Sequence, residues 1–145
     1  MGSECPKQYL PLLDRPLIWH ALRALCAAPA IQAVFVVLAP EDADWPTATM
    51  AALGPKLQVL RCGGAARADS VRNGLWAMAD RLGDIAGDWV LVHDAARPCL
   101  SEALIDELLR ELANDAVGGL LATPVADTLK RADDALHSVA TVPRA

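Results

Sequence analysis

An aspartate at the end of an apolar run is the residue of this sequence best placed to do chemistry. Asp94 follows the run Trp89–His93 and precedes a small-residue turn that ends in Arg97 and Pro98. A short continuous apolar run is typical of a strand that is buried on both faces of a parallel sheet. Ligands of such sheets bind beyond the carboxyl ends of the strands, where a carboxylate suits Mg²⁺ and Mg²⁺ suits phosphates. The local alternative is that Asp94 only caps the turn.

Two further segments carry groups that suit a phosphate-bearing ligand. Lys7 follows Pro6 in a loop-like segment, and a lysine there offers a compact positive charge to phosphate oxygens, although a surface lysine is the simpler interpretation. Gly63 and Gly64 leave a short apolar run, and Ser70 is expected to begin a helix. Glycines let a ligand approach the backbone, and a helix N-terminus carries unbonded N–H groups. Because the segment matches neither G-x-G-x-x-G nor a P-loop, a plain strand-to-helix turn explains it equally well.

A third segment, residues 123–131, ends an apolar run with a hydroxyl and then offers Asp127, Thr128 and two basic residues. These groups suit a sugar-phosphate-like ligand, and a solvated β-turn is equally consistent with them. A Ser-His-Asp hydrolase is disfavoured, because His93 and Asp94 are adjacent on the expected strand and point to opposite faces. The sequence also has no G-x-S-x-G motif.

Helical and strand patterns alternate along the chain. Apolar stripes and helix-starting residues predict helices over 16–25, 41–53, 70–82 and 101–112, and continuous apolar runs predict strands over 33–38, 57–60, 89–93 and 117–123. Residues 128–130 and 138–142 are expected to form a β-ribbon. The alternation indicates βαβ units, and therefore a doubly wound α/β fold with a mainly parallel sheet covered on both faces.

The composition fits one domain, over residues 1–145, and excludes several classes of protein. Hydrophobic residues make up 54% of the chain and aromatic residues only 4%, so aliphatic side chains must supply the core. The net charge of −5 without a basic run argues against a nucleic-acid partner. No apolar stretch reaches the ~20 residues that span a bilayer, and no signal peptide is visible. We therefore expect no membrane partner and a cytoplasmic location.

The four cysteines lie in different segments and never as C-x-x-C. Their spacing argues against a zinc cluster, and in a cytoplasmic protein against disulfides. We expect Cys5, Cys26, Cys62 and Cys99 to be small, partly buried thiols.

Taken together, four segments carry a resemblance to a known family. In this order and at these separations, ECPKQYL, GGAARADSV, WVLVHDAARP and TPVADTLK resemble the 2-C-methyl-D-erythritol 4-phosphate cytidylyltransferases, the CTP-using enzymes of non-mevalonate isoprenoid biosynthesis. VLVHDAARP and CPKQYL are specific to this family and its close relatives. The resemblance covers essentially the whole chain. It implies a Rossmann-like nucleotidyltransferase sheet with a β-ribbon arm, here about residues 126–145, through which two copies form a homodimer.

The resemblance also implies a nucleotide site and its metal. Lys7 matches the catalytic lysine that neutralises the triphosphate and the pentacoordinate phosphorus of the transition state. Asp94 matches the acid that holds Mg²⁺ against the CTP phosphates. The base-recognition loop corresponds to Gly63, Gly64, Ala65 and Ser70.

For the second substrate, the resemblance implies residues from the turn and from the arm. Ala95 and Arg97 belong to the neighbourhood of the nucleotide and the substrate. Thr128 and Arg144 match groups that bind methylerythritol phosphate, and the partner copy contributes the arginine, which also has a catalytic role. The reaction implied is attack by the substrate phosphate on the α-phosphorus of CTP with release of pyrophosphate, which requires no protein nucleophile.

Two alternatives and one departure from the family stay open at this point. The chain resembles, less closely, cytidylyltransferases for another polyol phosphate such as ribitol 5-phosphate, and it could also be a non-catalytic α/β binding domain. The family's opening Gly-rich loop, of the form A-A-G-x-G-x-R-M, and its second metal-binding acid in a C-terminal run are not found. We therefore expect an incomplete nucleotidyltransferase domain that is inactive on its own.

Overall fold

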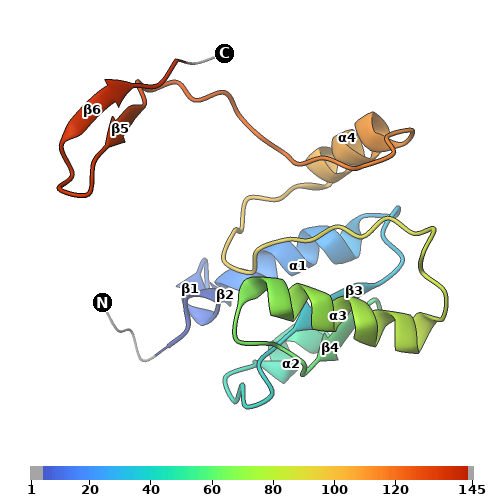
Figure 1. Cartoon of the computed structure of the whole chain (residues 1–145). Coiled ribbons are helices and arrows are strands. Elements are labelled where there is room, and N and C mark those ends of the chain that lie inside the picture. The colour runs from blue at the N-terminus through green and yellow to red at the C-terminus, as the bar shows by residue number, and fades with distance from the viewer. Residues whose placement is uncertain (1–4, 144–145) are drawn as a thin grey trace.

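A computed structural model describes residues 5–143 of the chain, and Figure 1 shows its arrangement. The elements in chain order are η1 (Lys7–Tyr9), β1 (Pro11–Leu12), β2 (Arg15–Pro16), α1 (Leu17–Ala27), β3 (Val34–Val37), α2 (Thr47–Ala51), β4 (Leu57–Leu60), α3 (Arg67–Leu82), α4 (Glu102–Leu112), β5 (Lys130–Ala132) and β6 (Ser138–Thr141). The alternation of helices and strands predicted from the sequence is thus present from α1 to α3.

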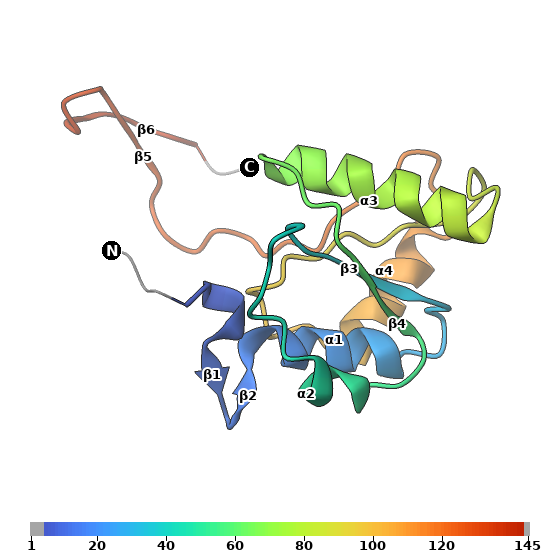
Figure 2. The same cartoon turned by 90° about the horizontal axis from the view of Figure 1, so that it is seen from below.

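The centre of the fold is a parallel pair of strands, β3 and β4, with helices on both faces. The pair runs in register from Val34 opposite Leu57 to Val37 opposite Leu60. Figure 2 shows α3 on one face and α1 with α2 on the other. This is the layering expected of a doubly wound α/β fold.

The core lies between the parallel pair and α1, and it is aliphatic as the composition predicts. Alternate residues of the first strand and its extension, Val34, Val36 and Leu38, pack with residues of α1 and α2, because successive side chains of a strand point to opposite faces. On the other face a Cβ atom at Gly74 of α3 would lie 2.8 Å from Val37 Cγ2. That glycine therefore lets α3 approach the strand closely.

The prediction of strands over 89–93 and 117–123 is wrong, because the structure describes both segments as irregular. They lie side by side, since Trp89 packs on Gly118, but no ladder joins them to the parallel pair. Gly118 has a φ of 113°, and the carboxylate of Asp115 accepts both the Val117 and the Gly118 N–H groups. A β-strand is defined by its hydrogen bonds to a neighbouring strand, so an apolar run without such a neighbour is irregular. As a result Trp89 is 52% exposed and Val117 is 93% exposed.

Two predicted helix boundaries also differ from the structure. The helix expected over 41–53 is confined to α2, which begins directly after Pro46, because proline suits the start of a helix and not its interior. The helix expected from Ser70 begins three residues earlier, at Arg67. The Asp69 carboxylate accepts the Ala66 backbone N–H, which satisfies a group at the new N-terminus.

The C-terminal part consists of α4 and a separate hairpin. Ser101 caps α4 as predicted, since its Oγ accepts the Leu104 N–H at 3.3 Å, and Ile105 is buried. The antiparallel hairpin β5–β6 projects away from the rest of the molecule (Figure 1) and is exposed along both strands. The expected β-ribbon is therefore present, although Arg144 lies outside the described residues. Within residues 5–143 we find no helix that could cross a membrane.

Tyr9 anchors η1 to the loop that follows β3. Its side chain is buried, and its hydroxyl donates to Asp42 Oδ2 at 2.7 Å. We expect Tyr9→Phe to lower the free energy of unfolding by about 1 kcal/mol, the usual loss for one hydrogen bond. Urea denaturation followed by tryptophan fluorescence at pH 7 measures this difference.

The same bond predicts a pH dependence. Burial, together with the hydrogen bond to Asp42, raises the pKa of Tyr9 well above its ordinary value. The unfolded tyrosine ionises near pH 10, so the stability that Tyr9 contributes is complete below about pH 10 and is lost as the pH rises further. The gap between wild type and Tyr9→Phe should therefore narrow above pH 10. A gap that stays constant from pH 7 to pH 11 would contradict this account.

Gly63 lies where the ends of β3 and β4 meet. Its N–H donates to the Leu38 carbonyl oxygen at 2.8 Å, and a Cβ atom there would lie 2.9 Å from the same oxygen. Because that neighbour is backbone, it cannot move aside, and Gly63→Ala should destabilise the protein by about 1–3 kcal/mol. Gly87→Ala is the matched control, because a Cβ atom at Gly87 meets nothing within 4 Å. Thermal unfolding compares the two variants, and equal melting temperatures would refute the close approach.

Candidate functional site

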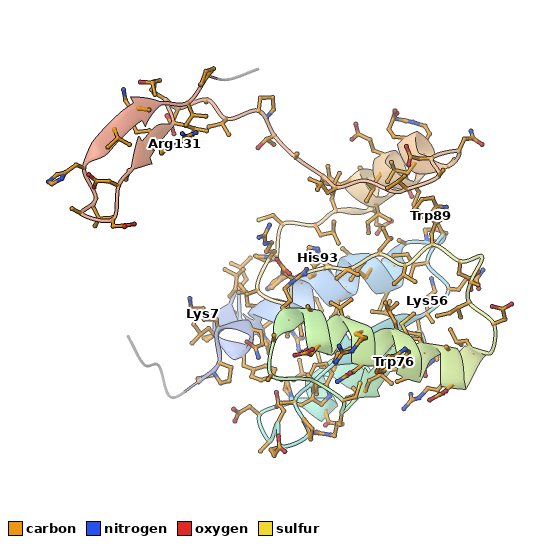
Figure 3. All side chains as sticks on the ribbon, in the orientation of Figure 1. Lys7, Lys56, Trp76, Trp89, His93 and Arg131 are labelled. Atoms are coloured by element: carbon orange, nitrogen blue, oxygen red, sulfur yellow. The ribbon has the colours of Figure 1, made fainter. Side chains whose placement is uncertain are left out.

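The candidate site lies at the carboxyl ends of β3 and β4. The loop after β3 is held by Arg61, whose Nη1 donates to the Asp42 carbonyl oxygen at 2.6 Å. The Tyr9 hydroxyl bond brings η1 to this same loop. The two views show η1, the start of α3 and the segment after His93 at the same end of the molecule (Figures 1 and 2), and Figure 3 labels Lys7 and His93 there. This is the edge at which the sequence predicts a ligand.

The loop Cys62–Gly64 is fixed by the first turns of α3. The Gly64 N–H donates to Ser70 Oγ at 3.0 Å, and Asn73 Nδ2 donates to the Cys62 carbonyl oxygen at 2.9 Å. A Cβ atom at Gly64 would overlap the Cβ of Asp69, so only glycine fits this position. The structure thus brings Gly64 and Ser70 into direct contact.

Asp94 opens a tight turn at the same end. The Arg97 N–H donates to the Asp94 carbonyl oxygen at 3.1 Å, and His93 Nε2 donates to the Arg97 carbonyl oxygen at 2.9 Å. His93 therefore supports the turn. The hydroxyl of Ser70 bonds to backbone groups of its own loop and helix, so these contacts do not form a Ser-His-Asp triad.

The Asp94 carboxylate is held by two guanidinium groups from different parts of the chain. Arg67, the first residue of α3, contacts Oδ1 through Nη2 at 2.9 Å and Nε at 3.0 Å. Arg97 contacts Oδ2 through Nε at 3.0 Å. The hydrogen bond from Arg67, with the charge of Arg97, holds the pKa of Asp94 below its ordinary value. The carboxylate is therefore ionised at neutral pH, and its side chain is 36% exposed.

Sequence reasoning missed Arg67 as a residue of this site. The expected helix began at Ser70, which left Arg67 in a loop with no assigned neighbour. Two signals were available: Asp69 stands at the third helical position, where an acid bonds back to the residue before the helix, and acids favour the first turn. A helix that begins at Arg67 directs this residue towards the turn after His93.

The structure gathers most of the expected residues and leaves others apart. Near the start of α3 it brings together Gly63, Gly64, Ser70, Asp94, Ala95 and Arg97. Lys7 is exposed on η1, which the Tyr9 bond joins to the same end. Thr128 is exposed in the segment that leads into β5, away from this end (Figure 1). Thr128 and the hairpin, as far as the chain is described, therefore lie apart from the Asp94 turn of their own chain.

The chemistry of these groups fits one type of metal site. Among the described residues no three acidic, histidine or cysteine side chains lie close enough to hold an ion. A site made only of protein ligands therefore does not fit. Mg²⁺ in phosphate sites is often held by one or two carboxylates together with the phosphates of the ligand. A single ionised carboxylate beside a glycine loop fits that arrangement.

Comparisons with known proteins identify the family of this chain. The family model for 2-C-methyl-D-erythritol 4-phosphate cytidylyltransferase (IspD) matches residues 1–145. The chain is 65% identical over 144 residues to the cytidylyltransferase of that name from Azoarcus sp. (strain BH72), covering 99% of this chain and 60% of that protein. The protein of the same name from Aromatoleum aromaticum is 61% identical, with 99% and 61% covered. The chain thus spans about 60% of the length of these curated relatives.

A solved structure supports the fold. The crystal structure of a 4-diphosphocytidyl-2C-methyl-D-erythritol synthase superposes with a TM-score of 0.85 at 38% identity, over 96% of this chain and 65% of that one. The α/β architecture with parallel strands is therefore of the nucleotidyltransferase type. With the family model matching throughout, this chain belongs to the 2-C-methyl-D-erythritol 4-phosphate cytidylyltransferase family.

Proposed function

We propose that this protein transfers a cytidylyl group from CTP to 2-C-methyl-D-erythritol 4-phosphate and releases pyrophosphate. The observation that carries the proposal is the contact between Asp94 and the start of α3. Arg67 of α3 holds the Asp94 carboxylate, and Ser70 of the same helix accepts the Gly64 N–H. The acid and the glycine loop are therefore held by the same helix. Family membership over residues 1–145 supports the same conclusion.

In this proposal the protein acts by positioning and charge neutralisation. Gly63, Gly64 and Ser70 recognise the cytosine base, which fixes the α-phosphorus for in-line attack by the substrate phosphate. Lys7 and Arg97 neutralise charge that develops on the phosphates. No protein nucleophile is needed because the attacking phosphate is already an anion.

Asp94 is the residue that would hold a divalent cation, which we propose to be Mg²⁺. When bound, the ion orients the triphosphate and neutralises part of its charge. The two arginines beside Asp94 lower the pKa of its carboxyl group, and the ionised carboxylate is the form that binds a cation.

The second substrate site is proposed to form between two copies of the protein. The β5–β6 hairpin lies apart from the Asp94 turn (Figure 1) and exposes apolar side chains, of which Leu136 is 85% exposed. These features favour a homodimer in which each arm carries Thr128, and also Arg144, to the site of the partner. We expect the dimer to act in the cytoplasm.

The proposal is tested with purified intact protein, CTP and Mg²⁺ by following pyrophosphate release. Methylerythritol phosphate should support turnover, and ribitol 5-phosphate should give a kcat/KM lower by about 100-fold or more, because a site that bonds one polyol rejects another. Preference for ribitol 5-phosphate would assign another polyol phosphate. Absence of CTP binding would support a binding domain without this activity.

Removing the charge of Asp94 should abolish most of the activity. Asp94→Asn keeps the size of the side chain but removes the anionic ligand, so we expect kcat to fall by about 100-fold or more. Asp80→Asn is the control, because Asp80 is an exposed acid near the other end of α3. Steady-state pyrophosphate release at saturating substrates measures both variants. Retention of more than a third of wild-type kcat by Asp94→Asn would contradict the assigned role.

Mixing two defective subunits tests whether the arm serves the partner. We expect Thr128→Ala to raise the KM for methylerythritol phosphate and to leave the KM for CTP unchanged. Co-expression with Asp94→Asn should form mixed dimers that contain one intact site, about a quarter of all sites if the subunits pair at random. Activity at low methylerythritol phosphate should then exceed the mean of the two variants.

The control for the mixing experiment is Ser138→Ala, which removes an exposed hydroxyl from the same hairpin and should behave as wild type. If the mixture gives only the mean activity of Thr128→Ala and Asp94→Asn, Thr128 serves its own chain and the shared site is wrong.

A further inference from the structure

Both carboxylate oxygens of Asp94 are occupied by arginines. Arg67 bonds Oδ1 through two nitrogens, and Arg97 bonds Oδ2. The two guanidinium groups come from different segments, one from the first residue of α3 and one from the turn that Asp94 itself begins. The candidate metal ligand is therefore already neutralised by the protein.

A divalent cation has to compete with both arginines for this carboxylate. Two guanidinium charges within hydrogen-bonding distance of the carboxylate repel an incoming cation, and their three contacts take most of its roughly four lone-pair positions. Binding of the ion is therefore more favourable once an arginine has left. Phosphate oxygens are the natural new partner, because a guanidinium binds phosphate as it binds carboxylate.

The surroundings allow the side chains to exchange partners while the backbone stays in place. The side chains of Arg67 and Arg97 are 67% and 76% exposed. The Ala66–Asp69 bond fixes the backbone beside Arg67, and the His93 ring fixes the backbone of Arg97. By contrast, Arg61 is bonded to backbone carbonyl oxygens, so a metal ion would not remove its partners.

We propose that Arg67 and Arg97 are exchangeable counterions of Asp94. In the nucleotide-free protein they position the carboxylate, and when a divalent cation binds to Asp94 they transfer to the phosphates of the nucleotide. The inference rests on the proposed function and adds Arg67 as a positioning residue that becomes a phosphate ligand. Cation binding frees the arginines from Asp94, and the nucleotide phosphates give these arginines a new partner. The binding of each ligand should therefore strengthen the binding of the other.

The test measures Mn²⁺ alone, and then CTP at saturating Mn²⁺, on the intact protein. In Arg67→Gln one competing charge is lost, so Mn²⁺ binding without nucleotide, followed by electron paramagnetic resonance, should tighten about fivefold. CTP binding at saturating Mn²⁺, measured by calorimetry, should weaken about tenfold because a phosphate partner is lost. A purely structural role for Arg67 would weaken both.

Arg81→Gln is the matched control, since Arg81 lies in the last turn of the same helix and bonds Gln58. It should change neither affinity. Arg97→Gln is the second variant and should shift both affinities in the same directions as Arg67→Gln. Unchanged or weaker Mn²⁺ binding in both site variants would overturn the exchange.

Asp94→Asn separates the two possible failures. If it abolishes Mn²⁺ binding while Arg67→Gln and Arg97→Gln do not tighten it, only the exchange is wrong. If Asp94→Asn leaves Mn²⁺ binding unchanged, Asp94 is not the metal ligand, and the metal role in the proposed function fails together with the exchange.

Discussion

The contact between Arg67 and Asp94 connects the two parts of the candidate site. The segment that ends in Asp94 has no ladder to the parallel strands, so its position depends on side chains and on one turn. Arg67 can reach it because α3 begins at that residue, and α3 is fixed by its close approach to β3 at Gly74. The parallel strands therefore position α3, α3 positions Arg67, and Arg67 holds Asp94.

The distribution of burial matches a site that binds a large anionic ligand. The core beneath the loops is apolar, and the charged groups of the site remain exposed to differing degrees. Exposed ion pairs contribute little to folding stability, which favours our proposal that the Arg67–Asp94–Arg97 cluster serves ligand binding. The projecting hairpin also contributes little to the core, because every residue of its two strands is exposed.

Much of the fold could be predicted from the sequence because its signals are local. The runs that became β3 and β4 are continuous and apolar, and the stripe that became α1 places Ile18, Ala21 and Leu22 in the core. The runs over 89–93 and 117–123 look similar but are not strands, since a strand also needs a bonded neighbour, which no single segment reveals. The start of α3 was misplaced because Ala66, the residue before the helix, is not one of the usual capping residues.

The site was predicted in a different way from the fold. Local chemistry indicated a carboxylate and a glycine loop at the edge of a sheet, and the structure brings the two together through Arg67. Local chemistry marked Thr128 as a group that suits a sugar-phosphate-like ligand, but the assignment of Arg144 came from the resemblance alone. Arg67 was missed because its role depends on where a helix begins and on a partner 27 residues away.

The most direct test of the account is a crystal structure of the intact protein with CTP and Mn²⁺, with the metal located by its anomalous scattering. The account predicts a Mn²⁺ ion bound directly to an Asp94 oxygen and to phosphate, with the cytosine against Gly63 and Gly64. A metal–nucleotide complex bound elsewhere, with Asp94 still paired to both arginines, would contradict it.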